Sequence, residues 1–270
     1  MNILGIDFTS RPTASKPITC ARCTLDGDTL RLVAIERWPS FAGFEFALAA
    51  PGPWVAGMDF PFGQSRRLVE GLGWPTTWAG YVERVAELER EQFRALLEAY
   101  KAPRPPGDKH HKRRCDAITN SQSPQTLYGT PVGLMFYEGA PRLLRAGVHL
   151  PHSHDGDRGR IVLEAYPGVL ARSLIGKASY KSDTASKQNA ARQAARAELL
   201  TRLQDGECVR RHGFALDATL DIARDHGADE LDALLCAIQA AWGVSQGGDG
   251  FGAPAGHDRL EGWICDPLLA

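Results

Sequence analysis

Two short apolar runs with the same ending constrain the fold of this chain most. Residues 3–8 read ILGIDF and residues 55–60 read VAGMDF, so each run closes on an aspartate followed by phenylalanine. Apolar runs of this length, bounded by turn residues, are typical of buried strands. A buried carboxylate without a partner is costly. Asp7 and Asp59 therefore lie at exposed strand ends, bind a cation, or pair with charged groups distant in sequence.

The first 60 residues predict the order strand, strand, strand, helix, strand. Two of the strands flank Asp26-Gly27-Asp28, a sequence that favours a hairpin turn. The predicted strands cover residues 2–8, 17–25, 29–37 and 54–60, and the predicted helix covers residues 40–50 with Ser40 as its N-cap.

The middle of the chain has a different character. Residues 78–101 have apolar side chains close to helical spacing and predict one amphipathic helix. A proline-broken basic stretch and several turn signals follow, with another helix near residues 140–146. We interpret residues 64–158 as an inserted, mostly helical subdomain within a single domain that covers residues 1–270.

The core pattern then resumes. Residues 160–164 predict a strand that ends at Glu164, and a helix is expected to begin near Pro167. Two further helices are predicted over residues 186–204 and 228–242, and residues 243–270 are interpreted as a C-terminal tail.

Composition excludes several classes of protein. The formal net charge is −1, so no global basic field attracts nucleic acid and any such contact needs a local patch. No apolar run approaches the roughly 20 residues of a membrane span, and the first residues lack the pattern of a secretory signal. We expect a cytoplasmic protein that makes no membrane contact. The pair Cys20 and Cys23 suggests zinc, but no second pair has the required spacing, and residues three apart on a strand point to opposite faces.

Carboxylates stand at the ends of several predicted elements. Asp7 ends the first strand, Asp59 the fourth and Glu164 a later one, while Asp229 and Asp232 open the helix over residues 228–242. This order of elements and acids resembles the ribonuclease-H-like fold. The resemblance implies an α/β fold with a mixed five-stranded sheet flanked by helices, and acids that converge on one or two Mg²⁺ or Mn²⁺ ions. Hard cations prefer such oxygen ligands, and two-metal sites need several carboxylates.

The resemblance extends to an ordered set of short motifs. These are GIDFTS, DFPFG, RRCD, EAYP, YKSD and ELDALLCA, at residues 5–10, 59–63, 113–116, 164–167, 180–183 and 230–237. Together they resemble domain-of-unknown-function family 429 (DUF429), described as predicted RNase H-like nucleases. The resemblance implies a hydrolase that cleaves phosphodiester bonds of nucleic acid or nucleotides, with an unassigned physiological substrate.

The candidate site residues follow from these motifs, each with a simpler alternative. We expect Asp7, Asp59, Glu164 and Asp232 to be catalytic, and Asp7, Asp59, Asp229 and Asp232 to bind metal. Asp7 could instead bond locally to Thr9 or Ser10. Glu164 could simply hold a turn, and Asp229 suits the first turn of its helix.

The cationic candidates are substrate contacts. The run KHHKRR at residues 109–114 is the only dense basic patch, and it could bind phosphate by charge or form a solvated loop. Arg114 is the preferred phosphate contact, and Lys181 could bind phosphate near the metals. The predicted substrate-binding residues are Thr9, Lys112, Arg113, Arg114, Asp116 and Lys181.

Two other classes of function compete with a nuclease. A nucleotide-binding protein of the actin and sugar-kinase type shares this core and a first strand that reads Gly-Ile-Asp. However, a Gly-rich phosphate turn does not follow Asp7, and no second Asp-x-Gly phosphate segment occurs. The third possibility is a catalytically silent binding module that keeps the fold.

Overall fold

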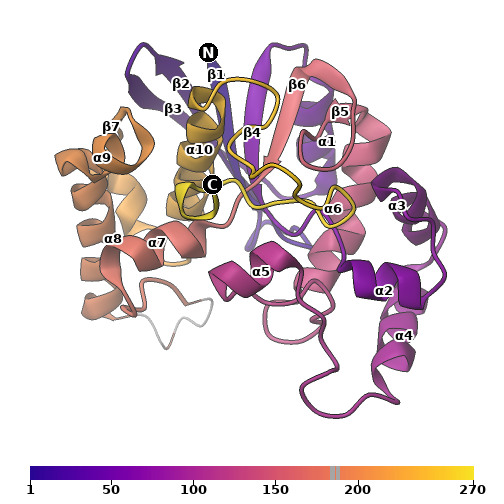
Figure 1. Ribbon diagram of the computed structural model, residues 1–270. Coiled ribbons are helices and arrows are strands. Elements are labelled where there is room, and N and C mark those ends of the chain that lie inside the picture. The colour runs from indigo at the N-terminus through magenta and orange to yellow at the C-terminus, as the bar shows by residue number, and fades with distance from the viewer. Residues whose placement is uncertain (183–185, 187–188) are drawn as a thin grey trace.

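A seven-stranded mixed sheet forms the centre of the molecule (Figure 1). The structure is a computed structural model that describes residues 1–182, 186 and 189–270. The strand order is β5-β6-β4-β1-β2-β3-β7. The strands are β1 Asn2–Asp7, β2 Ile18–Asp26, β3 Thr29–Trp38, β4 Trp54–Asp59, β5 Val148–His149, β6 Asp157–Glu164 and β7 Ala215–Asp217. The prediction of five strands is corrected to seven, because β5 and β7 add short strands at the two edges.

The central strand β1 joins the antiparallel and parallel parts of the sheet. It pairs antiparallel with β2 and parallel with β4, and β4 pairs parallel with β6. In the parallel pair, Asp7 of β1 is the register partner of Asp59 of β4. The two strands that end in these aspartates are therefore neighbours in the sheet. The carboxyl ends of parallel strands meet at one edge of a sheet, so both aspartates emerge at the same edge.

The predicted hairpin is also confirmed. Strands β2 and β3 pair from Ile18 with Trp38 to Asp26 with Thr29, and Gly27 at the turn has φ +57°. A positive φ is the conformation that such turns require and glycine adopts without strain. Cys20 and Cys23 of β2 are buried in the hydrophobic clusters on opposite faces of the sheet. The two thiols therefore do not form a shared metal site.

One face of the sheet is covered by α1, α2, α3, α4 and α6, which bury their apolar side chains in one shared cluster with β1 and β4. The predicted helix over residues 78–101 is two helices, because the backbone becomes extended at Glu89 (ψ 154°) and the second helix restarts there with a capping box of Glu89 and Gln92. The helices are α1 Phe41–Ala49, α2 Arg66–Gly71, α3 Trp78–Ala86, α4 Arg90–Lys101, α5 Arg114–Thr119 and α6 Val132–Ala146. Ser40 stands at the N-cap of α1 but makes no side-chain capping bond.

The opposite face is covered by the later helices, with α10 directly against the strands (Figure 1). These helices are α7 Pro167–Ile175, α8 Ala190–Arg202, α9 Cys208–His212 and α10 Asp229–Ser245. Pro167 occupies the first turn of α7 as expected. Of the helix predicted over residues 186–204, residues 187 and 188 lie outside the described part of the chain.

Two glycines let α10 lie unusually close to the sheet. Gly5 and Gly57 are register partners on β1 and β4. A Cβ atom on Gly5 would lie 1.9 Å from the carbonyl oxygen of Ala233, and one on Gly57 would lie 2.2 Å from that of Cys236. In each Gly-x-Asp segment, the glycine therefore lets α10 pack closely on the strand, and the aspartate two residues later ends the strand. Since α10 runs opposite to β1, its first turn reaches the edge where the aspartates emerge.

We expect Gly57→Ala to destabilise the protein by about 1–3 kcal/mol, because the added methyl group must push α10 away from the sheet. Gly250→Ala is the matched control, since its Cβ would meet nothing nearer than 3.8 Å. Urea unfolding of the two variants measures the difference. Equal stability of the two variants would contradict the close contact between α10 and the sheet.

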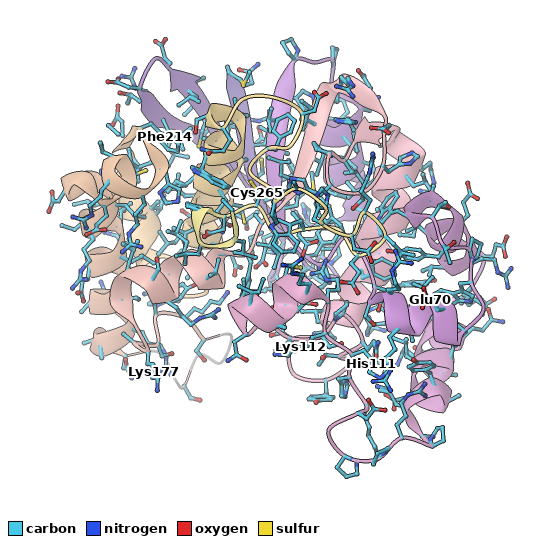
Figure 2. All side chains as sticks on the ribbon, in the orientation of Figure 1. Glu70, His111, Lys112, Lys177, Phe214 and Cys265 are labelled. Atoms are coloured by element: carbon cyan, nitrogen blue, oxygen red, sulfur yellow. The ribbon has the colours of Figure 1, made fainter. Side chains whose placement is uncertain are left out.

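The C-terminal segment packs on the core, unlike the tail that the sequence suggests. Residues 260–265 are mostly buried, and Cys265 lies among the side chains at the centre of the molecule (Figure 2). Ile264 forms a parallel bridge with Glu164, and the N–H of Cys265 donates to the Glu164 carbonyl at 2.8 Å. Tyr81 of the insertion donates its hydroxyl to the Leu260 carbonyl at 3.0 Å. The segment thus joins the strands to the insertion.

No helix in the described part of the chain has the length and apolar character needed to cross a membrane.

Candidate functional site

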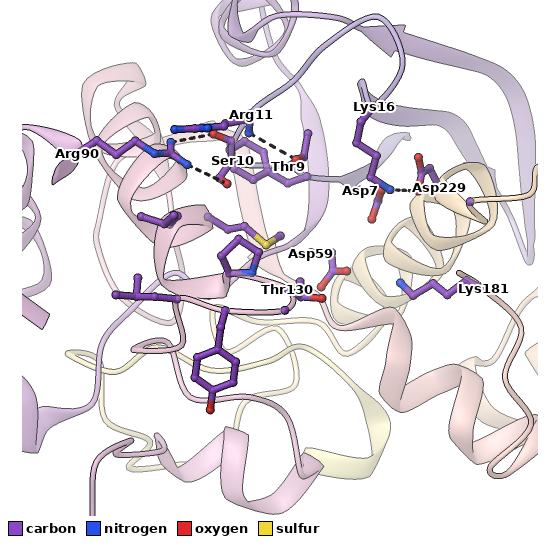
Figure 3. A pocket seen from close by; sticks show the side chains of 18 of the residues that line it. Asp7, Thr9, Ser10, Arg11, Lys16, Asp59, Arg90, Thr130, Lys181 and Asp229 are labelled. Atoms are coloured by element: carbon purple, nitrogen blue, oxygen red, sulfur yellow. Dashed lines mark hydrogen bonds and ion pairs between the residues drawn. The ribbon is translucent and has the colours of Figure 1, made fainter. Parts of the chain in front are cut away.

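The ends of β1 and β4 place two aspartates side by side at the floor of a cavity of about 830 Å³ (Figure 3). Asp7 and Asp59 are the last residues of their strands, and both line this cavity. The phenylalanines that follow them are buried and hold the strand ends in the core, with the rings of Phe8 and Phe60 4.6 Å apart. Local sequence therefore fixes both carboxylates at one point of the sheet edge.

The first turn of α10 brings two more aspartates to this edge. Asp232 is 1% exposed, accepts a hydrogen bond from the Tyr180 hydroxyl at 2.7 Å and forms an ion pair with Lys181. Asp229 forms an ion pair with Lys16, with 2.7 Å between the lysine Nζ and the carboxylate Oδ1. Two lysines thus face four aspartates, so negative charge is in excess in this cluster, which we call the aspartate cluster (Asp7, Asp59, Asp229 and Asp232).

Burial and the neighbouring charges shift the pKa values of the cluster. Burial, followed by repulsion from Asp232, raises the pKa of Asp7 well above its usual range. Burial also raises the pKa of Asp59 to about 7, although Lys181 acts in the opposite direction. Burial opposes the charge on Lys181, but Asp232 still raises the pKa of this lysine well above its usual range. The cluster therefore holds an ionised lysine beside two carboxyl groups whose pKa values are raised.

The raised pKa of Asp59 predicts that the free energy of unfolding of the metal-free protein falls as the pH rises from about 4 to about 7. The unfolded chain loses this proton near pH 3.8, whereas the folded protein keeps it to about pH 7. The unfolded state is therefore favoured increasingly as pH rises through this window. Asp59→Asn is expected to flatten that slope, and Asp26→Asn in the exposed hairpin turn is the control. Urea unfolding in EDTA across this pH range measures the effect, and identical slopes for both variants would contradict it.

A second, smaller cavity of about 290 Å³ adjoins the first. Both cavities are lined by Asp59, Thr130, Met135 and Lys181, so they meet at the aspartate cluster. The large cavity carries most of the cationic side chains, and the small cavity combines aromatic and aliphatic side chains with the charged groups of Arg113, Asp116 and Glu164. A concave site with a few convergent polar groups is the usual form of a ligand site.

Glu164 is held in a buried ion cluster beside the small cavity. Arg113 donates to its carboxylate at 2.6 and 2.7 Å and to that of Asp116 at 2.8 and 3.0 Å. The N–H of Phe62 also donates to Glu164, at 2.9 Å. All three charged side chains are almost fully buried. This placement argues against the predicted catalytic role of Glu164 and against the predicted substrate contacts of Arg113 and Asp116, because the one guanidinium and the two carboxylates already hold one another in buried ion pairs.

The predicted basic patch does not act as one surface. Arg113 and His111 are buried, whereas Lys112 is exposed and donates to Asn120 at 3.3 Å. His111 and Lys112 lie next to each other on the segment that leads into α5 (Figure 2). The Arg114 guanidinium lies 5.9 Å from the ring centroid of Trp263, and Arg114 lines neither cavity at the aspartates. Of the predicted substrate-binding residues, the structure brings Thr9 and Lys181 to the large cavity.

Several residues of the cleft were not predicted from sequence. They are Arg11, Lys16, Arg90, Arg94, Thr130, Tyr166 and Tyr180. Tyr180 belongs to the YKSD motif, so the sequence offered a signal for it. The last residue of that motif, residue 183, lies outside the described part of the chain. Arg90 and Arg94 belong to an ordinary amphipathic helix, and nothing in the local sequence separates them from other surface cations.

The chemistry of the aspartates fits a divalent cation at one pair. Among the described residues, no three His, Cys, Asp or Glu side chains are arranged to hold a metal ion. Asp229 and Asp232 are engaged by lysines, so the predicted set of four metal ligands is not assembled. Asp7 and Asp59 remain, and Mg²⁺ commonly binds one or two carboxylates while keeping waters and substrate phosphates. Burial disfavours the charged form of both carboxyl groups, and a bound cation would compensate for that cost.

A comparison with protein-family models identifies the family of this chain. A family described as Protein of unknown function (DUF429) matches residues 5–250, which is most of the chain. No curated protein and no solved structure matches.

Proposed function

The chain belongs to the DUF429 family, and we propose that it is a divalent-metal-dependent phosphodiesterase of RNase H-like type. The observation that carries the proposal is the register pair of Asp7 and Asp59 at the ends of two parallel strands, at the meeting point of two cavities. The order of the first five elements and the acids on β1, β4 and α10 supports the RNase H-like interpretation.

Asp7 and Asp59 would hold Mg²⁺ or Mn²⁺ through their carboxylate oxygens. When bound, such an ion acts as a Lewis acid toward a phosphoryl oxygen and lowers the pKa of a water molecule. Because burial raises the pKa of both carboxyl groups, a bound cation competes with protons for them, so cation binding becomes tighter as pH rises.

Lys181 is the second functional group of the proposed mechanism. Its ammonium lies between the Asp232 carboxylate and both cavities, and its raised pKa keeps it charged. A fixed cation beside the scissile phosphate stabilises the charge that develops in the transition state. Asp232 orients this lysine, and Tyr180 in turn fixes Asp232 through its hydroxyl group. In this proposal Asp232 acts through Lys181.

A specific observation also favours a second candidate function. The ion pairs of Lys16 with Asp229 and of Lys181 with Asp232 already neutralise half of the aspartate cluster. The same cleft, without a metal, would serve as an anion-binding module. This candidate predicts phosphate or nucleotide binding that EDTA does not change.

The test of the proposed function is a Mn²⁺ titration followed by a cleavage assay. Isothermal titration of the metal-free protein at pH 6 and pH 8 is expected to show saturable binding that is tighter at the higher pH. Labelled single-stranded, double-stranded and branched oligonucleotides then report cleavage with Mg²⁺ or Mn²⁺ against EDTA. Failure to bind Mn²⁺ at millimolar concentration, with no cleavage of any substrate, would reject the metal-dependent enzyme in favour of the binding module.

A further inference from the structure

The two cavities that meet at the aspartate cluster differ in chemistry. Besides Lys181, which lines both cavities, the large cavity is lined by four cations: Arg11, Lys16, Arg90 and Arg94. The guanidinium of Arg11 has no ion-pair partner among the described residues, and Arg94 has only a 3.5 Å contact with Glu91. Both can therefore bind an anion without breaking a tight pair. Figure 3 shows Arg11 and Arg90 above Asp59, on the side of the cleft opposite Lys181.

The hydroxyl groups of the large cavity add to its affinity for phosphate. Thr9 and Ser10 lie beside Arg11, and Thr130 lines the cavity below Asp59 (Figure 3). Arg90 donates to the Ser10 carbonyl at 3.0 Å and pairs with Glu138, so its guanidinium is held in place beside the chain that follows Asp7. Arginine with hydroxyl donors is the usual combination that contacts a nucleic-acid backbone. The volume of about 830 Å³ exceeds the space that one phosphate needs.

The small cavity offers flat apolar walls over a rigid polar floor. Its walls are Phe60, Pro61, Val132, Met135, Tyr166 and Ile264, and the buried ion cluster of Arg113, Asp116 and Glu164 forms part of its lining. Tyr166 is fixed at its hydroxyl group by Arg172, which donates to it at 3.1 Å. Flat rings of this kind bind bases by stacking, whichever base is present.

The size of the small cavity sets a limit on what enters it. A volume of about 290 Å³ lies at the lower end of ligand pockets and holds one planar ring system with its sugar. A Watson–Crick pair is two such ring systems joined edge to edge and does not fit. A base that reaches this cavity is therefore unpaired.

From this juxtaposition we propose that the cleft binds single-stranded polynucleotide. One unpaired base lies in the small cavity against Tyr166, the adjoining phosphodiester lies at Asp59 and Lys181, and the following phosphates lie along Arg11 and Arg94. This inference deepens the proposed function and rests on it for the identity of the scissile bond. The binding geometry itself stands on the two cavities.

The test is a binding measurement on the full chain in EDTA, so that cleavage does not interfere. Fluorescence anisotropy compares a short mixed-sequence single strand, as DNA and as RNA, with the same sequence in a blunt duplex. Tyr166→Ala is expected to weaken single-strand binding about tenfold, the effect of losing one base–aromatic stack. Tyr166→Phe keeps the ring and is expected to bind as the parent does. A shared loss by the two variants would overturn stacking on this ring.

The arginine wall is tested by salt dependence. Arg11→Gln combined with Arg94→Gln is expected to flatten the log–log slope for the single strand by about 1.4 units, or about 0.7 for each lost phosphate contact. Arg145→Gln is the matched control, since Arg145 is 69% exposed on α6 and lines neither cavity. An unchanged slope in the double variant would overturn the assignment of phosphates to this wall.

The outcomes separate this inference from the proposed function. Single-strand preference that depends on Tyr166 and the arginines, without cleavage under any metal condition, supports the inference and rejects the phosphodiesterase. Metal-dependent cleavage with duplex bound as tightly as single strand supports the enzyme and overturns the inference. Absence of binding and of cleavage overturns both.

Discussion

Asp7→Asn is expected to abolish metal-dependent phosphodiester cleavage while leaving the metal-free protein equally or more resistant to heat. The activity falls by at least about 10²–10³-fold, the scale on which one electrostatic contact to a transition state acts. Stability does not fall, because the substitution removes one of several repelling carboxyl groups from a buried site. Cleavage rates in Mg²⁺ and Mn²⁺, together with the midpoint of thermal unfolding in EDTA, measure the two effects.

Two comparisons sharpen this prediction. Asp59→Asn should behave in the same way, because Asp59 is the register partner of Asp7. Asp26→Asn removes the same charge from an exposed turn and should leave activity unchanged. A large loss of thermal stability in Asp7→Asn would show that Asp7 is a structural partner, and a retained cleavage rate would remove it from the metal site.

Arg113→Met is expected to cost about 3–5 kcal/mol of the free energy of unfolding, the largest stability effect that we predict for a single charge. Removal of Arg113 leaves the carboxylates of Asp116 and Glu164 buried without their cation, and breaking a buried ion pair on one side is strongly destabilising. Chemical unfolding in urea at neutral pH measures the loss. The variant should also regain stability on acidification, since protonation then neutralises the two acids.

Arg31→Met is the control for this variant. Arg31 pairs with Asp217 at 2.8 Å, but both side chains are more than half exposed, so the expected cost is no more than about 1 kcal/mol. A loss of similar size in the two variants would show that the buried cluster is not a structural element. It would then return Glu164 and Arg113 to the list of candidate site residues.

The central strands and their aspartates were predictable because the responsible signals are local. The apolar runs before Asp7 and Asp59, and the Asp-Gly-Asp turn between β2 and β3, each lie within a few residues. The edge strands β5 and β7 were missed because two or three residues carry no periodic pattern. The break between α3 and α4 was missed because apolar spacing continues across it without glycine or proline.

The charged contacts of the site could not be predicted, since they join segments far apart in the sequence. Lys16 and Asp229 are 213 residues apart, and Lys181 and Asp232 are 51 apart. The basic run at residues 109–114 has the composition of a solvated loop. Lys112 of this run is exposed and fits that interpretation, but Arg113 is drawn inside by two acids, one of which is 51 residues later.

The C-terminal segment has a consequence for synthesis on the ribosome. Glu261 accepts hydrogen bonds from the N–H groups of Arg66 and Arg114 through its carboxylate, and from the Arg113 guanidinium through its carbonyl. Domains emerge N-terminus first, so the sheet and the insertion leave the ribosome before these contacts can form. A nascent chain that stalls before residue 258 contains the whole aspartate cluster but lacks the segment whose Glu261 binds the first residues of α2 and α5. A nascent chain therefore acquires its finished cleft late, after the residues that bear its charge have been translated.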